Sequence, residues 1–410
     1  MDFGYSDEQE AFRGRLRKWL ERCGDDGSIP RLKGLVLDEK VAVGRVWQKR
    51  LYEDGWCGLS WPAEYGGQGV GLVEQIIFQE ELARAGSPQL VNLLALSMVG
   101  PMIIEHGSEA QKKRYLKSIL NADEIWCQCF SEPGAGSDLA SLSTRAELDG
   151  DDYLVNGTKV WTSYAQYADY CILLARTDRG PKPHEGITML IVDMKSDGVE
   201  VSPLRQLNGD SEFNEVYLEN VRVPRSGVIG EPGGGWKMAI AMLMHERATL
   251  TFQRQLQSRV ALDDMPKFAR YFDHGKGAPA DDPVYRQRLA QAWIESEAIR
   301  LTSLRHLTRR LKGDPPGAEG SMEKLFWSEM YQRMLAVPMS MSGPYSMLSG
   351  EDPRAPLAGQ WPELYLYSRG RTIAAGTSEV QRNIIGERVL GLPKEPGPPR
   401  ETPFKDLPQN

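Results

Sequence analysis

The sequence predicts an α+β fold in which a β region lies between two helical regions. From Ser6 to about Asn121 apolar residues recur at the spacing of a helix face, and around Glu124 the period shifts towards two. Helical spacing returns after the glycine-rich break at 230–236. We therefore expect an N-terminal helical domain (1–121), a central antiparallel β domain, sheet or barrel (122–230), a C-terminal helical domain (231–393) and a proline-rich tail (394–410).

In the N-terminal region, two predicted helices flank a loop. The loop, 59–69, contains a proline and several glycines that cannot continue a helix. The helix faces are predicted at Val43, Val46, Trp47 and Leu51 before the loop, and at Ile76, Ile77, Glu80 and Leu82 after it.

The central region predicts a series of short strands. Tyr153 to Trp161 is expected to form a hairpin that turns at Asn156-Gly157, because this pair tolerates the positive φ of a tight turn. Further strands are predicted at 168–175, 186–194, 199–204 and 216–223. In the last of these strands, every second residue is apolar on both sides of Glu219-Asn220, and the alternation shifts by one residue there.

The C-terminal region predicts helices with clear start signals. Asp282 is expected to cap a helix with Pro283 in its first turn, and Ser378 with Gln381 has the pattern of a capping box for the last helix. Another helix is predicted over about 322–335. The residues expected to face inward are Trp236, Ile240, Leu243 and Leu250 on the first helix, Leu289, Trp293, Leu304 and Leu311 on the second, and Val380, Ile384 and Ile385 on the last.

Composition excludes several classes of protein. The 49 Lys and Arg against 56 Asp and Glu leave a net charge of −7, which disfavours a nucleic-acid or anionic-membrane binder. The longest apolar stretch, 90–104, is interrupted by Asn92 and Pro101 and is shorter than the roughly 20 residues of a membrane span. Acidic residues near the N-terminus argue against a targeting peptide, and five cysteines without a CxxC pair fit a reducing compartment. We expect a cytoplasmic protein.

Several common motifs fail when they are tested. His245-Glu246 lacks the second histidine of a zinc-protease helix, because Thr249 occupies that position. Gly134-Ala-Gly136 lacks the third glycine of a dinucleotide fingerprint, and Ser137 lacks the preceding glycine of a nucleophile elbow. The five histidines are scattered, so no metal site is predicted.

Three features remain as candidates. Glu246 has mainly apolar helical neighbours, and burial there would raise its pKa from about 4.3 towards the range of a general base. The alternative is a structural glutamate paired with an arginine. The stretch 131–138 combines small residues with hydroxyls and suits either a ligand or a tight turn. Trp161 offers a planar face beside Thr162 and Ser163, although most tryptophans at such spacing pack in a core.

Taken together, these segments resemble the acyl-CoA dehydrogenase family over nearly the whole chain. The family fold, an N-terminal helical domain, a central β-barrel and a C-terminal four-helix bundle, agrees with the pattern. The resemblance implies FAD as the cofactor and a reaction in which an acyl-CoA loses an α-proton to a base and a β-hydride to flavin N5, giving a trans-2-enoyl-CoA. The matching strings are Trp61-Pro-Ala-Glu-Tyr-Gly-Gly67, Phe130-Ser-Glu-Pro-Gly-Ala-Gly-Ser-Asp138, Lys159-Val-Trp-Thr-Ser163, Asn214-Glu-Val216, Gly376-Thr-Ser-Glu-Val-Gln-Arg-Asn-Ile-Ile385 and Arg388-Val-Leu-Gly-Leu-Pro393.

The resemblance also implies roles for individual residues. Trp161 would lie against the flavin ring, Ser163 would bond flavin N5 and Ser131 would lie near the pyrimidine end. Many members place the base directly before the Gly-Thr pair, where this chain has Ala375, whereas isovaleryl and long-chain types place it on a bundle helix before an arginine. Glu246-Arg247 matches that second position, so Glu246 is the predicted base. The remaining implied contacts are Gln128, Ser137, Thr377 and Glu379 for the cofactor, and Ser137, Arg247 and Ala375 for the acyl-CoA.

One departure from the family concerns the FAD diphosphate and adenine. Family members grip them across a dimer with Arg-x-x-Phe-Gly and Gln-x-x-Gly-Gly segments, which 268–275 and 341–345 do not match cleanly. Either this subfamily binds the diphosphate and adenine of FAD differently, or a related, non-identical subunit supplies the residues that bind them. The second arrangement resembles bacterial heteromeric members that act in sterol side-chain breakdown. A homo-oligomer and a heterotetramer both stay open, with an electron-transferring flavoprotein as the expected acceptor. The alternatives in function are a catalytically silent structural subunit and a flavin monooxygenase on the same scaffold.

Overall fold

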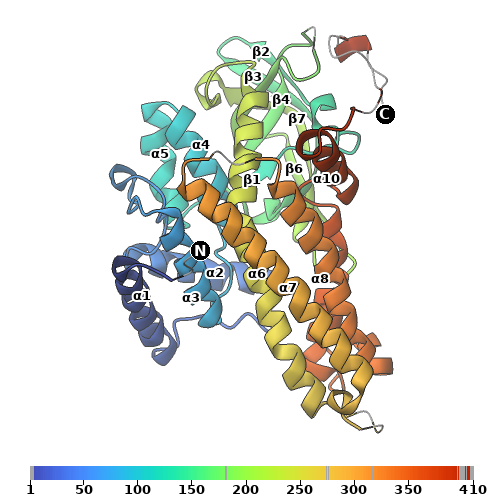
Figure 1. Cartoon of the computed structure of the whole chain (residues 1–410). Coiled ribbons are helices and arrows are strands. Elements are labelled where there is room, and N and C mark those ends of the chain that lie inside the picture. Colours follow the sequence, from blue (N-terminus) through green and yellow to red (C-terminus); the bar gives the residue numbers. More distant parts are fainter. Residues whose placement is uncertain are drawn as a thin grey trace. The chain divides into compact units, whose positions relative to one another are not determined.

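The chain folds into an N-terminal helical region, a central sheet and a C-terminal helical region, so the predicted fold class is confirmed (Figure 1). The computed structural model describes residues 4–180, 182–273, 275, 277–314, 317–394, 396, 402 and 404–406, without the side chains of 244–254. Two compact units emerge, Met1–Glu246 with Glu395–Asn410, and Arg247–Lys394. Among the described helices, none combines the length and apolar character needed to cross a bilayer.

The N-terminal region consists of helices that pack around buried tryptophan and isoleucine side chains. Trp47, Leu51 and Ile77 are buried as predicted, whereas Val46 is 71% exposed and does not belong to the packed face. The predicted loop 59–69 is confirmed and includes one short 3₁₀ turn, Ala63–Tyr65. The helices are α1 (Asp7–Asp25), α2 (Leu37–Glu53), α3 (Leu72–Arg84), α4 (Gly100–His106) and α5 (Glu109–Leu120).

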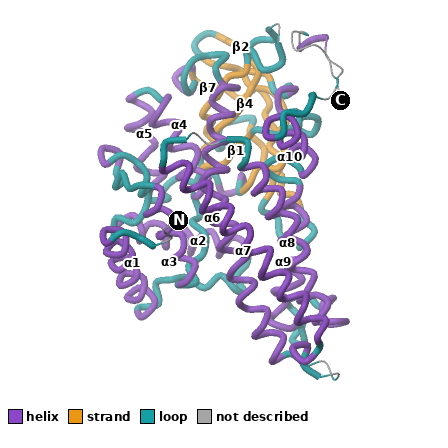
Figure 2. The backbone as a smooth tube through the Cα atoms, in the orientation of Figure 1, coloured by secondary structure: helices purple, strands orange, loops and turns teal. Residues whose placement is uncertain are grey.

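The central region is a curled seven-stranded sheet within the described residues (Figure 2). Its strands are β1 (Trp126–Cys129), β2 (Arg145–Asp149), β3 (Asp152–Ser163), β4 (Tyr170–Arg176), β5 (Ile187–Asp193), β6 (Val199–Leu204) and β7 (Phe213–Pro224). They are ordered β1-β4-β2-β3-β7-β6, with β5 on β4. Most pairs are antiparallel as predicted, but β1 runs parallel to β4, and β2 meets β4 in parallel at Arg145 and Arg176.

The predicted hairpin turn at Asn156-Gly157 is wrong. β3 continues through this pair, and the hairpin between β2 and β3 turns at Gly150-Asp151 instead. Gly157 serves a close approach, because a Cβ there would lie 2.4 Å from Thr144 Oγ1 and 2.8 Å from Thr144 Cα. The predicted offset at Glu219-Asn220 is confirmed: the β3–β7 register shifts there and Asn220 has a φ of 52°.

The C-terminal region is helical, and its helix starts agree in part with the sequence. Asp282 caps α7 as predicted, since Val284 N donates to its carboxylate at 2.8 Å. The cap of α10 is Thr377 rather than Ser378, because Val380 N donates to Thr377 Oγ1 at 3.2 Å. The helices are α6 (Gly235–Tyr271), α7 (Pro283–Leu311), α8 (Gly320–Ser342), α9 (Gln360–Ser368) and α10 (Ser378–Ile384).

The face that α7 buries differs from the prediction. Trp293 and Leu311, predicted to face inward, are 50% and 58% exposed, and Ile240 of α6 is 42% exposed. The buried face of α7 holds Ala292, Ser296, Ile299, Ser303 and Leu307. Serine and alanine allow close helix packing but carry little hydrophobic signal, so the apolar pattern misplaces Trp293 and Leu311. Leu289, also predicted to face inward, packs partly buried against the core. The side chain of Leu250, the last predicted inward residue of α6, lies outside the described residues.

The fit of β3 against Thr144 predicts the effect of one methyl group. We expect Gly157→Ala to lower the free energy of unfolding by about 1–3 kcal/mol, because the new Cβ would displace Thr144. Urea unfolding followed by fluorescence measures this. Gly14→Ala in α1 is the control, since nothing lies within 4 Å of a Cβ there, and equal stability of the two variants would contradict the close approach.

Candidate active site

Trp161 lies at a bulge in β3 and faces solvent. The register of β3 against β7 shifts between Lys159 and Thr162, and Trp161 has a φ of 61°. A bulge redirects the side chain of the extra residue away from the regular pleat. The indole is 61% exposed, and Phe213 meets it edge-on with ring centroids 6.3 Å apart. The alternative that Trp161 packs in the core is therefore wrong.

Three predicted cofactor residues lie on the segments beside this bulge. Val160 N donates to Ser131 O at 2.9 Å, which places Ser131 directly next to it. Ser163 ends β3 opposite Phe213, and Gln128 lies on β1 three residues before Ser131. All three are half-buried, and their side chains form no hydrogen bond with another described residue. Polar groups in such positions are available to a ligand.

Asn214 holds the backbone where β3 leaves the bulge. It is fully buried, and its Nδ2 donates to Thr162 O at 3.0 Å and to Gln166 Oε1 at 2.6 Å. The first bond fixes Thr162, between Trp161 and Ser163, and the second ties this point to Gln166. Asn214 belongs to one of the strings that match the family but had no predicted role. Its signal was a lone amide at a strand start, which needs a buried partner to be stable there.

A buried ion pair anchors the turn that follows β1. Lys159 Nζ lies 2.7 Å from Glu132 Oε1 and 3.0 Å from Phe130 O, and the Lys159 side chain is fully buried. Glu132 also accepts from Ser143 N at 2.7 Å and Thr144 N at 2.9 Å. Burial alone would raise the pKa of Glu132, but the Lys159 ammonium and these hydrogen bonds outweigh it and hold the pKa to about 2. Burial lowers the pKa of Lys159.

Ser137 stands at the exposed end of this turn. The segment that follows is tied to the sheet by Arg176, which donates to Ala140 O at 2.8 Å and Leu142 O at 3.1 Å. The same guanidinium donates to Pro183 O at 2.9 Å and Glu185 O at 3.1 Å. Burial lowers the pKa of Arg176 to about 10. The stretch 131–138 begins with a tight turn, in which Glu132 N donates to Ala135 O at 3.1 Å, and Ser137 is open to solvent. The turn does not exclude a ligand, which stays a prediction.

Residues 375–379 form a second group of predicted site residues, all in the unit Arg247–Lys394. Ala375 has a left-handed φ of 56°, and its N–H donates to no described residue. Lys324 Nζ donates to Gly376 O at 2.5 Å. The Gln381 amide donates to Ala375 O at 3.2 Å and Gly376 O at 3.3 Å, which closes the loop onto the start of α10.

Thr377 and Glu379 belong to the cap of α10. Thr377 is half-buried, whereas Glu379 is exposed in the first turn. Hydrogen bonds from its own N–H and from the Thr377 hydroxyl lower the pKa of Glu379. An anionic side chain also suits the positive end of the helix dipole.

Glu246 and Arg247 lie within α6, but their side chains are outside the described residues. The structure brings Ser131, Trp161 and Ser163 together at one bulge, and Gln128 lies on β1, three residues before Ser131. Ser137 ends the adjoining turn, and Ala375, Thr377 and Glu379 form a separate group.

The fold defines a class of protein: a helical domain, a curled sheet and a second helical domain, with the exposed Trp161 on the sheet. Family models match along the chain for the acyl-CoA dehydrogenase N-terminal domain at residues 6–123, middle domain at 127–221 and C-terminal domain at 233–390. The chain belongs to the acyl-CoA dehydrogenase family, and the fold and enzyme class implied by the resemblance are confirmed.

Individual relatives narrow this assignment. The chain is 38% identical over 403 residues to the acyl-CoA dehydrogenase IpdE1 of Mycolicibacterium smegmatis, covering 95% of this chain and 99% of that protein. It is similar to the ChsE4-ChsE5 complex from Mycobacterium tuberculosis, with a TM-score of 0.82, 34% identity and coverage of 96% and 100%. A structure described as the Tcur3481-Tcur3483 steroid ACAD has a TM-score of 0.82, 33% identity and the same coverage.

The buried ion pair predicts a large effect of substitution. We expect Lys159→Met to lower the free energy of unfolding by about 3–5 kcal/mol, because Glu132 would keep an uncompensated buried charge. The double variant with Glu132→Gln should lose less than the sum of the single variants. Lys195→Met is the control, since Lys195 pairs with Asp169 at 2.7 Å but is 75% exposed. Equal losses for Lys159→Met and Lys195→Met in urea unfolding would contradict the anchoring role.

The same pair makes folding sensitive to acid. The pKa of Glu132 is about 2 in the folded chain against an ordinary value of 4.5. A carboxyl with a depressed folded pKa stabilises the fold above its unfolded pKa, and this contribution is lost as the pH falls from about 4.5 to about 2. We expect Glu132→Gln to flatten the fall in unfolding free energy between pH 5 and pH 2.5. An unchanged slope in urea titrations over this range would show that the depressed pKa is wrong.

Proposed function

We propose that this chain is an FAD-dependent acyl-CoA dehydrogenase that forms the α,β double bond of a CoA thioester with a bulky, steroid-derived acyl group. The observation that carries the cofactor assignment is the solvent-facing indole of Trp161 beside the unpaired side chains of Gln128, Ser131 and Ser163. A flat aromatic ligand with a polar edge suits this arrangement, because the indole covers its face and the hydroxyls and amide meet its edge.

The isoalloxazine ring of FAD has this shape and this polar edge. When bound, FAD supplies the acceptor for the hydride that leaves the acyl β-carbon. In the proposal Trp161 excludes water from one face of the ring, and Ser131 and Ser163 orient the ring through their hydroxyls. Ser137, Thr377 and Glu379 are assigned to the rest of the cofactor by the family pattern.

Glu246 is the proposed base for the α-proton. Met242, one helical turn before it on α6, is fully buried, so the helix face that leads to Glu246 is apolar. A carboxylate with few waters around it has a raised pKa and is a stronger base. Ala375 stands where many members of the family carry their base, which agrees with a base elsewhere.

The thioester oxygen needs hydrogen-bond donors, since the α-proton of a thioester is too weakly acidic for a carboxylate acting alone. The N–H of Ala375, which donates to no described residue, is the proposed donor. Ser137 and Arg247 are the proposed contacts to the remainder of the acyl-CoA. The steroid character of the acyl group is carried over from the relative described as a steroid ACAD. An electron-transferring flavoprotein is the proposed acceptor of the electrons.

The base assignment predicts the loss of one spectral change. Anaerobic addition of a steroid side-chain acyl-CoA to the holoenzyme is expected to bleach the flavin, and Glu246→Gln is expected to slow bleaching by at least about 10³-fold, because a neutral amide cannot accept the proton. Glu231→Gln is the control, since Glu231 is exposed and precedes α6. Stopped-flow absorbance measures the rates.

Each other outcome of that experiment has a defined meaning. Bleaching at an unchanged rate in Glu246→Gln would remove Glu246 from its role. If no thioester in a panel of chain lengths and ring contents bleaches the flavin, the chain is a silent subunit. If the reduced enzyme forms an oxygenated product in air, the chain is a monooxygenase on the same scaffold.

We also propose that a related acyl-CoA dehydrogenase subunit completes the assembly, and two observations support this. The segments 268–275 and 341–345, which replace the family's arginine and glutamine patterns, contribute to an aromatic cluster. In it Phe268 stacks on Phe272 at 4.9 Å between ring centroids, and Phe272 meets Tyr345 edge-on at 5.9 Å. The rings pack on one another and offer no charge to a phosphate, and the arginine of the first segment, Arg270, is exposed.

The second observation is an apolar face on α7. Trp293, Ile294 and Leu301 are 50%, 55% and 48% exposed, and Ile294 and Leu301 are two turns apart on one side of the helix. Exposed apolar groups gathered on one helix face mark an interaction surface. The relative named ChsE4-ChsE5 is a complex of two different chains, and we infer that a subunit of this kind covers the α7 apolar face (Trp293, Ile294 and Leu301).

If a second subunit is needed, the chain purified alone should bind FAD incompletely. Purified without a second subunit, the protein should contain less than one FAD per chain, and co-expression with a related acyl-CoA dehydrogenase subunit from the same organism should raise this to one. Ile294→Asp with Leu301→Asp should break the complex in size-exclusion chromatography with light scattering. Val46→Asp, at an exposed valine of α2, is the control. Full FAD occupancy and activity of the chain alone would instead remove the heteromeric assembly.

A further inference from the structure

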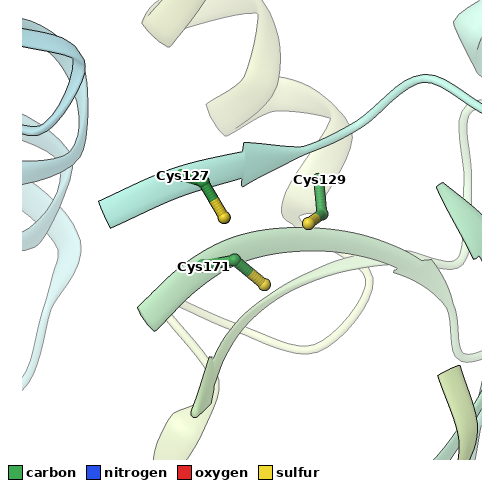
Figure 3. Close-up of side chains that lie close together, drawn as sticks. All are labelled: Cys127, Cys129 and Cys171. Carbon is green, nitrogen blue, oxygen red and sulfur yellow. The ribbon is translucent and has the colours of Figure 1, made fainter. Parts of the chain in front are cut away.

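Three cysteines converge inside the central sheet (Figure 3). Cys127 and Cys129 are two residues apart on β1, so their side chains project to the same face of the strand. Cys171 of β4 stands directly opposite Cys127 in the parallel register. All three side chains are fully buried, and their Sγ atoms lie within 4.8 Å of one another.

This spacing is close to that of sulfur ligands around one ion. Metal–sulfur bonds of about 2.3 Å place three sulfurs about 4 Å apart in a trigonal plane, or two sulfurs about 4.6 Å apart in a line. The thiols therefore need to move by less than about 1 Å to close on an ion. An edge strand allows such movement, since β1 is at the end of the strand order.

The ligand set selects the kind of ion. The cluster contains sulfur alone, without a histidine or carboxylate from the described residues. A structural zinc site takes four ligands, whereas three thiols without a fourth ligand suit a soft ion of low coordination number, and thiolates select Cu(I). The nearest hydroxyl contact is Thr162 Oγ1, 3.9 Å from Cys129 Sγ, and a neutral hydroxyl is a hard, weak ligand for such an ion.

We propose that Cys127, Cys129 and Cys171 form a binding site for one Cu(I) ion. Each of the three sulfurs binds the ion as a thiolate and releases its proton to solvent, so that no oxidation state changes. The site lies on the opposite face of β1 from Gln128 and is independent of the acyl-CoA chemistry.

The test uses the reduced, full-length holoprotein under anaerobic conditions. Cu(I) is offered as its complex with a chromophoric Cu(I) chelator, and the protein is expected to withdraw one equivalent per chain. X-ray absorption at the copper edge should show sulfur ligands alone, at about 2.3 Å. Because the thiols release protons when they bind the ion, the apparent affinity should fall as the pH decreases.

Matched variants identify the ligands. Cys171→Ala should weaken Cu(I) binding by at least about 100-fold, more than the usual effect of losing an outer-shell partner. Cys57→Ala should leave binding unchanged, because Cys57 is buried elsewhere and bonds to Leu120 O at 3.1 Å. Failure to withdraw Cu(I), nitrogen or oxygen ligands in the absorption spectrum, or equal binding by Cys171→Ala and the unmodified protein would each overturn the proposal. The spectrum of the unmodified protein decides the matter even if Cys171→Ala does not fold.

Discussion

The ion pair between Lys159 and Glu132 links the two segments on which the candidate site is built. Glu132 belongs to the turn after β1, and Lys159 lies two residues before Trp161 on β3. An ammonium that is fully buried is stable only beside a carboxylate, so the two segments cannot separate without exposing a charge to an apolar interior. The hydrogen bond from Val160 N to Ser131 O continues this connection towards Trp161. The relative positions of Ser131 and the indole therefore follow from electrostatics deep in the sheet.

Much of the fold could be predicted because its signals are local. The change of period near Glu124, the cap at Asp282 and the offset at Glu219-Asn220 each depend on neighbouring residues alone, and each is confirmed. The errors come from long-range packing. Asn156-Gly157 has the composition of a turn, but the approach of Thr144 requires the glycine in mid-strand. The buried face of α7 includes Ala292, Ser296 and Ser303, whose fit against a neighbouring helix adds little to the hydrophobic pattern.

The site could be predicted as a set of residues but not as an arrangement. Family strings identified Ser131, Trp161 and Ser163, whereas the exposure of Trp161 depends on a register shift between strands that no string encodes. The cysteine cluster could not be predicted either, because it also depends on how two strands pair. Cys127 and Cys171 meet only because β1 and β4 run parallel, and the alternating pattern favoured antiparallel neighbours throughout.

The indole of Trp161 has a further thermodynamic consequence. Its left-handed backbone and the edge of Phe213 hold it in water, where an apolar ring of this size is unfavourable, and the bulge prevents it from turning inward. Any flat molecule that covers it removes this unfavourable hydration in the native state alone. Binding of such a molecule at Trp161 therefore stabilises the native state against unfolding. The melting temperature of the protein consequently rises with the fraction of chains that have the molecule bound.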